Sequence, residues 1–529
     1  MILIKSNSLL KILNIIIFFF IFFGIFNSLI LDISWDEQFH YDLGKNTFNY
    51  LTSLGTKFES IKGSEFSSKI YWTIQYIFTL FFSKNYSLQI NHLFNFFFSV
   101  AAIIGFVKFF EQFFFKQKIL SSIIFIIIFI YPVIFGHLSI NPKDTIVFFA
   151  HSWCSYLLIR YLKKKKEEIH YKFIFFFSLI FSIGTGIQFF FIGTLVPIFI
   201  YIFFNTFFFK KKIFVKEIFS LNFLIEIIYT FFLILFFIIL FWPETHKNII
   251  NLPFEYLLNN FSIRGYPYSL INGEIFFLNQ PNYYFYIFFF FHSPEFIIFL
   301  YVISLTYFIV KYIFFLKKIQ KYYNEILFIF LIFIYPFLIV FFFKIKPYDS
   351  IRLFIWIIPY FLIIPASCLF FLINNKNMFV KKIFFLCFIF KIVYLYNFFF
   401  ITPYSYSYFN FFAGSNKDKH KKFEVDYWSL SLGELIKNIN FHDKSLKIAS
   451  CGFQPELGQM YFKKYHNKYI KFSSYYEKDT SFALIINRVS NFNGNHMTCD
   501  EMLPGDDLFI VSRNGQFFSS FRKLNKASN

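Results

Sequence analysis

Asp36 and Glu37 directly follow the first long apolar run of the chain, where they form an acidic pair. The chain has only 30 Asp and Glu residues among 529, so two acids beside a membrane-length apolar run need a physical reason. A charge near a bilayer is unfavourable unless it is solvated or paired, which makes such residues functional candidates. We interpret Asp36 as a catalytic base, with Glu37 as its catalytic neighbour. The alternative is that both acids only occupy the first turn of a helix, where the macrodipole favours negative charge.

A third candidate acid, Asp144, ends the segment GHLSINPKD at residues 136–144, and Lys143 precedes it directly. A carboxylate can accept the proton of an acceptor hydroxyl, and a cation can stabilise a departing phosphate as its charge develops. Asp36, Asp144 and Lys143 could therefore serve group transfer from a lipid phosphate. The simpler alternative is that Lys143 and Asp144 form an ion pair, with Asp144 capping the helix that follows.

Arginine is rare in this chain, because lysine supplies almost all of the basic residues. The planar guanidinium of arginine can bind a phosphate or a carboxylate through two parallel hydrogen bonds, which lysine cannot do. Arg264 and Arg352 fall in polar loops between apolar runs, and we infer that they bind phosphate. The alternative is a salt bridge to Glu244 or to Asp349. The six arginines are Arg160, Arg264, Arg352, Arg488, Arg513 and Arg522.

The elements that carry these loops are expected to be transmembrane helices. Hydrophobic residues make up 57% of the chain and charged residues only 15%, a composition outside the range of soluble domains. A spanning helix needs about 20 apolar residues, and about eleven runs approach that length. The sequence therefore predicts an α-helical polytopic membrane protein. The predicted ranges are 9–31, 88–110, 119–135, 145–162, 172–187, 188–204, 221–242, 294–316, 326–343, 353–372 and 383–401.

Lysine clusters predict the orientation of these helices. The formal net charge of +21 is concentrated in short clusters between apolar runs, as in the cytoplasmic loops of membrane proteins. Nucleic acid is for this reason not an expected partner. The clustered side is predicted to be cytoplasmic, and the loops that hold Asp36, Asp144 and Arg352 to face outward. The clusters are Lys5 and Lys11, Lys108 to Lys118, Arg160 to Lys166, Lys210 to Lys216, Lys317 to Lys321 and Lys376 to Lys382.

The chain changes character near Pro403, where polar residues and short alternating segments replace the long apolar runs. We therefore divide it into a transmembrane domain at 1–402 and a small α/β domain at 403–529, which an odd number of spans places outside the cytoplasm. Strands are predicted at 446–452, 482–487 and 507–512, and helices at 434–440 and 456–464. This domain has no phosphate-binding glycine loop, and we assign it no chemistry. Cys451 and Cys499 could form a disulfide if the domain lies in an oxidising compartment.

The outward loops contain motifs that resemble those of a known family. Gly136-His137 and Asn141-Pro142-Lys143-Asp144 are similar to the G-H-x-x-x-N-P-K-D loop of bacterial proteins classed with glycosyltransferase family 39. These are GT-C superfamily integral-membrane glycosyltransferases, related to protein O-mannosyltransferases and to the aminoarabinose transferase acting on lipid A. One departure is that Leu353 follows Arg352 where the family pattern suggests a histidine. Further similar motifs, in the expected order, are Trp242-Pro243, Asn272-Gly273, Pro281 with Tyr283-Tyr284, Ser293-Pro294-Glu295, Tyr348-Asp349, Pro403-Tyr404, Tyr408-Phe409-Asn410, Phe423-Glu424 and Asp426-Tyr427-Trp428.

The resemblance implies a GT-C-like enzyme that moves one sugar from a polyprenyl-phosphate donor to an acceptor hydroxyl. The reaction would take place at the outer face of the inner membrane, on a lipid, glycan or protein acceptor. Asp36 would be the base, and Lys143 with Asp144 would lie near the donor phosphate and the acceptor. Arg264 and Arg352 as phosphate clamps are our own inference. The residues expected to bind substrate are Lys143, His137, Asn141, Arg264, Arg352 and Asp349.

The residues do not demand a metal or another cofactor. A divalent metal could be held by His40, His137 or His292 beside a carboxylate, and the alternative is that these histidines are simply solvated.

The alternative function is a non-catalytic transporter or lipid flippase, with the outer domain as a binding module. Transporters place ionisable residues near the bilayer midplane beside broken helices. In this chain most of the unusual polar residues stand instead at the outward ends of apolar runs.

Overall fold

The computed structural model describes residues 6–525 apart from several segments. Arg264, one of the two arginines expected to bind phosphate, lies outside the described residues, as do Lys116 and the lysine clusters at 163–166, 210–216 and 317–321. The segments left out within this range are 58, 60, 62–66, 114–116, 163–168, 205–219, 250, 252–254, 256–267, 311–322, 344–345, 440–446, 474–479 and 493–494.

Helices make up most of the described chain, and they lie over each of the predicted apolar ranges. An apolar segment in lipid must satisfy its backbone hydrogen bonds internally, and a helix does this within one segment. The helices are α1 Ser6–Ile30, α2 Glu37–Thr52, α3 Ile70–Thr79, α4 Ser87–Phe113, α5 Lys118–Phe129, α6 Pro132–His137, α7 Asp144–Leu162, α8 Tyr171–Ile187, α9 Phe191–Thr194, α10 Val196–Phe204, α12 Leu221–Leu240, α14 Tyr284–His292, α15 Glu295–Val310, α17 Tyr323–Phe343, α18 Ile358–Asn374, α19 Met378–Ile401, α20 Lys419–Lys422, α21 Ser431–Asn438, α22 Pro455–His466 and α23 Cys499–Met502.

Four of the described helices are long and apolar enough to cross a membrane. A fifth candidate span arises if α14 and α15, which are bent by 112° at a short break, are counted as one. The predicted number of about eleven is not confirmed, because several of the predicted ranges hold shorter helices. The range 119–135 is one example, since it is divided between α5 and α6 just before Pro132, whose ring cannot continue a helix. The four are Asn7–Ile30, Lys84–Gln112, Leu221–Leu240 and Met378–Ile401.

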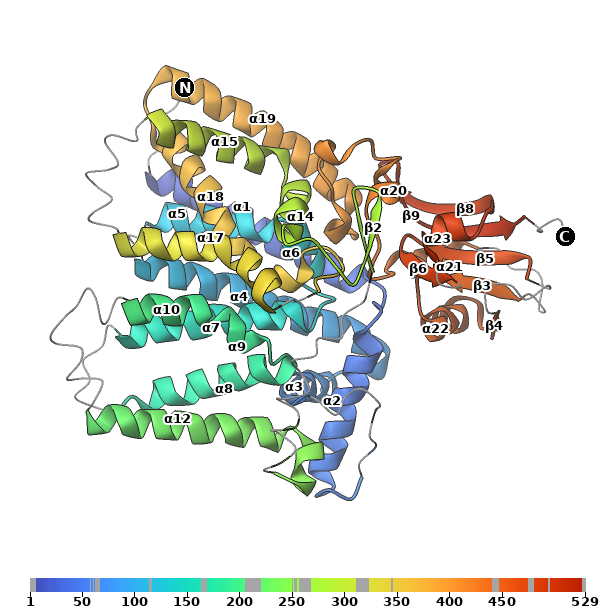
Figure 1. Cartoon of the computed structure of the whole chain (residues 1–529), viewed down its shortest axis with the longest axis horizontal. Coiled ribbons are helices and arrows are strands. Elements are labelled where there is room, and N and C mark those ends of the chain that lie inside the picture. Colours follow the sequence, from blue (N-terminus) through green and yellow to red (C-terminus); the bar gives the residue numbers. More distant parts are fainter. Residues whose placement is uncertain are drawn as a thin grey trace.

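The long helices lie side by side with their ends at two common levels (Figure 1). Helix α4 packs against α7, α7 against α8, and α8 against α12, while α1 and α18 both pack against α5. A hydrogen bond between Ser28 and Ser139 and an ion pair between Arg352 and Asp144 bring the end of α1, the start of α7 and the segment before α18 to the same end of the helices. The short helices α2 and α3 and the C-terminal sheet lie at that end (Figure 1).

The C-terminal part forms a small sheet covered by helices, and the strands and helices predicted there are confirmed. Its five strands have the order β4-β3-β5-β9-β8, in which β3 is parallel to β4 and β5 and the other pairs are antiparallel. A disulfide joins Cys451 to Cys499. The strands are β3 Ile448–Cys451, β4 Phe472–Ser473, β5 Phe482–Ile486, β8 Gly505–Arg513 and β9 Gln516–Leu524, and two separate hairpins consist of β1 Tyr268–Ile271 with β2 Glu274–Phe277 and β6 Val489–Phe492 with β7 Asn495–Thr498.

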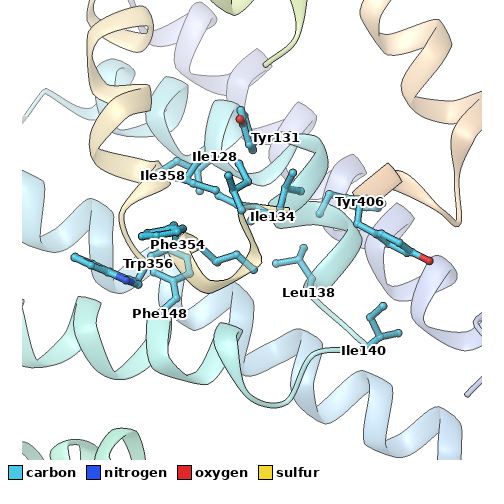
Figure 2. Close-up of a cluster of buried hydrophobic side chains, with 14 of the residues drawn as sticks. Ile128, Tyr131, Ile134, Leu138, Ile140, Phe148, Phe354, Trp356, Ile358 and Tyr406 are labelled. Atoms are coloured by element: carbon cyan, nitrogen blue, oxygen red, sulfur yellow. The ribbon is translucent and has the colours of Figure 1, made fainter. Parts of the chain in front are cut away.

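A cluster of buried apolar side chains supports two of the polar loops at this end (Figure 2). Leu138 and Ile140 enter the cluster from the loop between α6 and α7. Phe354 and Trp356 enter it from the segment that leads into α18, and Tyr406 from the C-terminal part. All five are at most 2% exposed. The loop that holds Asp144 and the loop that holds Arg352 therefore rest on one common packed base.

Candidate active site

Asp36 stands at the N-cap position of α2, directly after the turn that follows α1. Its side chain makes no capping hydrogen bond to the helix, although its backbone oxygen accepts one from His40 N at 3.1 Å. The carboxylate is only partly buried. The preceding residue, Trp35, donates its backbone N–H to the oxygen of Trp428, which fixes the turn against the C-terminal part. Capping of α2 therefore does not account for the Asp36 carboxylate, which stays available for chemistry.

Glu37 has a different environment, since both of its carboxylate oxygens are engaged. Oε2 accepts the backbone N–H of Ser34 at 2.5 Å, and Oε1 lies 2.7 Å from Nε2 of His92. The other ring nitrogen of His92 is 3.1 Å from the backbone oxygen of Ser28. These contacts tie the start of α2 to α4 and to the end of α1. The geometry favours a structural role for Glu37, and its catalytic role stays a prediction.

The loop between α6 and α7 is shaped by Asn141. Its side-chain Oδ1 accepts the backbone N–H groups of Lys143 and Asp144, and its Nδ2 donates to Asp144 Oδ2 at 2.9 Å. Gly136 lies just before this loop, at the end of α6. A Cβ atom there would lie 2.2 Å from the backbone nitrogen of Tyr406, so only glycine fits at this position. The observed contacts of Asn141 organise this loop, and its substrate-binding role stays a prediction.

His137, also predicted to bind substrate, is fully buried. Its Nε2 lies 3.0 Å from the hydroxyl of Tyr427, and its Nδ1 lies 3.4 Å from Asn141 Nδ2. These contacts connect the α6–α7 loop to the C-terminal part. The histidine is therefore better placed to hold the loop than to contact a ligand directly.

Buried polar residues of the membrane helices also hold this loop, and sequence reasoning did not select them. Asn95 Nδ2 and Ser99 Oγ of α4 both donate to the backbone oxygen of Leu138, each at 2.9 Å. Ser28 of α1 and Ser139 share a hydrogen bond of 2.7 Å. The signal that could have found them is the presence of polar side chains within otherwise apolar runs, where an unpaired polar group is unfavourable.

Arg352 forms the second half of the site, at the start of the short 3-10 helix η4 Arg352–Phe354. Its Nη1 lies 3.5 Å from Asp144 Oδ2, and its Nη2 lies 3.0 Å from Asp349 Oδ2. The guanidinium also stacks near the rings of Tyr348 and Trp428, at 4.9 and 5.0 Å from their centroids. The salt bridge to Asp349 that was the alternative for Arg352 is therefore present, together with one to Asp144.

Asp36, Lys143 and Arg352 all act electrostatically on one buried residue, His40. The ring of His40 is buried and stacks on Trp72 at 4.7 Å between centroids. Burial lowers the pKa of His40 to about 4; Asp36 opposes this effect, and the positive charges of Lys143 and Arg352 add to it. Asp36 is also among the acids that raise the pKa of Arg352. The structure thus brings the three residues into one electrostatic neighbourhood, with His40 neutral at pH 7.

The C-terminal part contributes further charges that sequence reasoning did not place here. Arg488, between β5 and β6, donates from Nη2 to Asp349 Oδ1 at 2.8 Å, and from Nη1 to the backbone oxygen of Tyr427 at 2.7 Å. Its guanidinium lies 4.9 Å from the ring centroid of Trp35. Glu424 lies 3.9 Å from Arg488 Nε and accepts the backbone N–H of Val489 at 3.0 Å. The rarity of arginine was the signal that could have pointed to Arg488.

The buried carboxyl of Glu424 should make the stability of the folded protein depend on pH. Burial raises the pKa of its carboxyl from 4.5 to about 7, although Arg488 acts in the opposite direction. Between these two values the folded chain binds more protons at this group than the unfolded chain, so the contribution of Glu424 to stability falls as the pH rises. The replacement Glu424→Gln removes this titration. We expect the variant to gain melting temperature relative to wild type between about pH 5 and about pH 7.5.

The measurement is a pair of thermal unfolding series in detergent at matched pH values. His40, with its lowered pKa, has the opposite effect on stability but is present in both proteins, so the difference between the series isolates Glu424. Parallel curves for the two proteins would mean that Glu424 is already ionised across this range.

The predicted metal-binding histidines each contact a different partner. His40 stacks on Trp72, His137 contacts Tyr427, and Nε2 of His292 lies 2.5 Å from Ser350 Oγ. Within the described residues, three or more His, Cys, Asp or Glu side chains do not gather in a way that could hold a metal ion. Among the described residues, these histidines therefore do not form a metal site with a carboxylate.

The fold and the gathered charges define a broad class. The chain is a mostly helical protein with several apolar helices that could span a membrane, and Asp144, Asp349, Arg352 and Arg488 form linked ion pairs at one end of those helices. Comparison with protein-family models and with curated proteins gave no significant match. The family resemblance therefore depends on the loop motifs alone.

Proposed function

We propose that this protein is a GT-C-like membrane glycosyltransferase that moves a sugar from a polyprenyl-phosphate donor to an acceptor hydroxyl at the outer face of the inner membrane. The proposal rests on three loops, distant in sequence, that lie close together: Ser34, two residues before Asp36, donates to the backbone oxygen of Ile140 at 3.4 Å, and Arg352 pairs with Asp144 at 3.5 Å. Asp36, Lys143 and Arg352 also act electrostatically on the same residue, His40. This arrangement supplies the Asp36 carboxylate, which makes no capping hydrogen bond to α2, beside two cations at the end of a helix bundle. Transfer from a lipid phosphate needs a carboxylate to accept the proton and cations to stabilise the departing phosphate.

In the proposed reaction the acceptor hydroxyl gives its proton to Asp36 while its oxygen forms a bond to the anomeric carbon of the donor sugar. The bond between that carbon and the phosphate oxygen breaks, and its electron pair stays on the phosphate. Lys143 and Arg352 stabilise the negative charge that develops there. Asp144 and Asp349 hold Arg352 in place by salt bridges at 3.5 and 3.0 Å.

The disulfide of the C-terminal part supports an outward-facing site. This bond between Cys451 and Cys499 is typical of proteins in an oxidising compartment. The same part contributes Trp428, Arg488 and Glu424 to the surroundings of the charged loops. The site would then lie between the outer ends of the helices and an extracytoplasmic domain, where a lipid-linked donor and a polar acceptor can meet.

A non-catalytic transporter or lipid flippase remains the second candidate, because one candidate span is sharply broken. The 112° bend between α14 and α15 is the kind of discontinuity on which transporters build their sites. The buried histidine at this bend, His292, contacts Ser350 Oγ and the backbone oxygen of Tyr408. The charged loops at the helix ends favour the transferase.

The experiment that separates the two is mass spectrometry of envelope glycolipids and glycoproteins from cells with and without the gene. A transferase predicts that one class of molecule loses the mass of a single sugar when the gene is deleted, and regains it with the wild-type gene. Unchanged masses, together with a lipid that accumulates on one leaflet, would instead support a flippase.

A further inference from the structure

The loop between α17 and α18 has an unusual backbone at Asp349 and Ser350. Their φ angles are +52° and +63°, in the left-handed region that residues other than glycine rarely adopt. Two such residues in succession persist only where surrounding contacts hold them. Arg352 lies two residues after Ser350, so the conformation of this short segment contributes to the position of its guanidinium.

Two contacts from distant parts of the chain hold this backbone. The Oγ of Ser350 lies 2.5 Å from Nε2 of His292, at the end of α14. The carboxylate of Asp349 is shared between Arg488 at 2.8 Å and Arg352 at 3.0 Å. All of these side chains are at most 6% exposed. A series of alternating charges therefore runs from the C-terminal part into the loop: Arg488, Asp349, Arg352, Asp144.

We propose that Arg488 is a positioning residue through which the C-terminal part holds the 348–352 loop, and with it Arg352, in the arrangement that forms the site. Arg488 itself does not touch Arg352 in this scheme; it acts by fixing the carboxylate that Arg352 binds. Its second amino group is fixed by the backbone oxygen of Tyr427. Its guanidinium also stacks near Trp35, the residue before Asp36, so it contacts both halves of the site.

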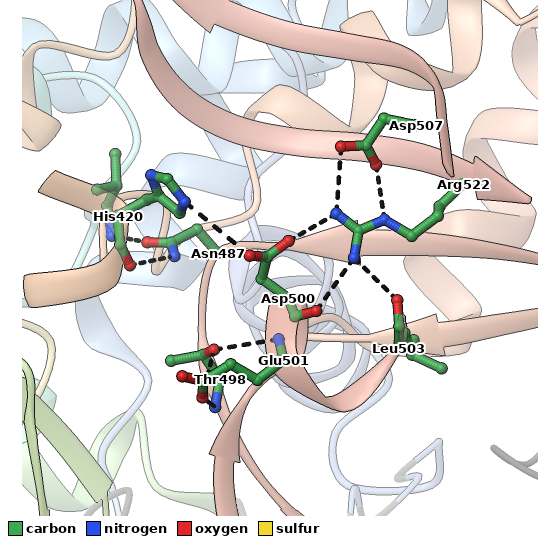
Figure 3. A network of polar contacts seen from close by, with 9 residues as sticks. His420, Asn487, Thr498, Asp500, Glu501, Leu503, Asp507 and Arg522 are labelled. Carbon is green, nitrogen blue, oxygen red and sulfur yellow. Dashed lines mark hydrogen bonds and ion pairs between the residues drawn. The ribbon is translucent and has the colours of Figure 1, made fainter. Parts of the chain in front are cut away.

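A matched control exists in the same part of the chain. Arg522 of β9 is 6% exposed and Arg488 is 5% exposed, and each binds two acids. Arg522 pairs with Asp500 at 2.6 Å and Asp507 at 2.7 Å and also donates to Leu503 O, so its contacts stay within the C-terminal part (Figure 3). Loss of Arg522 disturbs this part without removing a contact to the 348–352 loop.

The test is hydrogen–deuterium exchange of the full-length protein in nanodiscs, followed by mass spectrometry of peptides from 346–356 and 136–146. In Arg488→Gln we expect exchange in 346–356 to become about tenfold faster or more, with a smaller increase in 136–146. In Arg522→Gln we expect faster exchange near 499–508 and wild-type exchange in 346–356. Asp349→Asn removes the ion pair with Arg488 from the loop side, together with the ion pair to Arg352, so exchange in 346–356 should rise at least as much as in Arg488→Gln. This variant covers the case in which Arg488→Gln does not fold.

Wild-type exchange of 346–356 in both Arg488→Gln and Asp349→Asn would overturn the proposal. Equal loosening of this segment by Arg522→Gln would also overturn it, because the effect would then reflect general damage to the C-terminal part. None of these readings requires turnover.

The catalytic consequence rests on the proposed function. In Arg488→Gln, kcat for sugar transfer should fall about tenfold or more, and Arg488→Lys should restore part of it because the charge remains. If the wild-type protein transfers no sugar, the proposed function fails while the exchange result stands. If transfer proceeds and Arg488→Gln changes neither exchange nor kcat, the positioning role alone fails.

Discussion

Replacing Asp36 with asparagine should lower kcat for sugar transfer by about 10²- to 10⁴-fold while the protein remains folded. Asparagine has nearly the same shape as aspartate but cannot accept a proton at neutral pH, and general-base catalysis contributes roughly 10²- to 10⁴-fold. The Asp36 side chain makes no capping hydrogen bond, so the substitution breaks no such bond at the start of α2. We therefore expect a fall in kcat within that range, with unchanged expression and melting temperature.

The matched control is Asp42→Asn on the same helix. The Asp42 carboxylate accepts a hydrogen bond from Gln38 Nε2 at 3.0 Å, and both Asp42 and Asp36 are partly buried. This variant should retain wild-type turnover in the same assay. Full activity in Asp36→Asn would reject the base assignment, and equal loss in both variants would point to damage of α2 instead.

Arg352→Lys should have the second-largest effect, although it conserves the charge. Lysine cannot reach Asp144 and Asp349 at once through a planar fork, so the position of the positive charge becomes loose. Removal of one well-placed donor from a charge-stabilising site lowers kcat by about 10²- to 10³-fold. The ammonium still compensates the two buried acids in part, so stability should fall much less than activity.

Kinetic and thermal measurements on the purified variant check this expectation. Arg160→Lys, at the exposed end of α7, is the control for an arginine-to-lysine change elsewhere in the chain and should match wild type in both measurements. Wild-type turnover in Arg352→Lys would remove Arg352 from the group of phosphate-binding residues. If stability and activity fall to the same degree, the role of Arg352 is that of a structural salt bridge.

Much of the helical architecture could be predicted from the sequence, because long apolar runs have few other stable conformations. The number of spans could not be predicted in the same way. Apolar composition is similar for a helix that crosses a membrane and for one that is interrupted and buried among others. Pro132 and the break before Glu295 show this, since each divides an apolar stretch into two helices.

The loops of the site were predictable because charges are rare in this chain, so each charged residue beside an apolar run carried information. Asp36, Lys143, Asp144 and Arg352 were selected in this way, and the structure brings them together. The contributions of the C-terminal part were not predictable, since they depend on tertiary contacts. Arg488 reaches Asp349 across 139 residues of sequence, and no local pattern encodes that contact.

The shared apolar base beneath the two loops has a consequence for how inactive variants are interpreted. Leu138 and Ile140 belong to one loop and Phe354 and Trp356 to the other, yet all four pack into a single cluster (Figure 2). Because packed interiors transmit volume changes rather than absorb them, a truncation on one side displaces the other. Random mutagenesis screens would then recover lesions in this cluster alongside the charged residues, and the affected side chains would touch neither sugar nor phosphate.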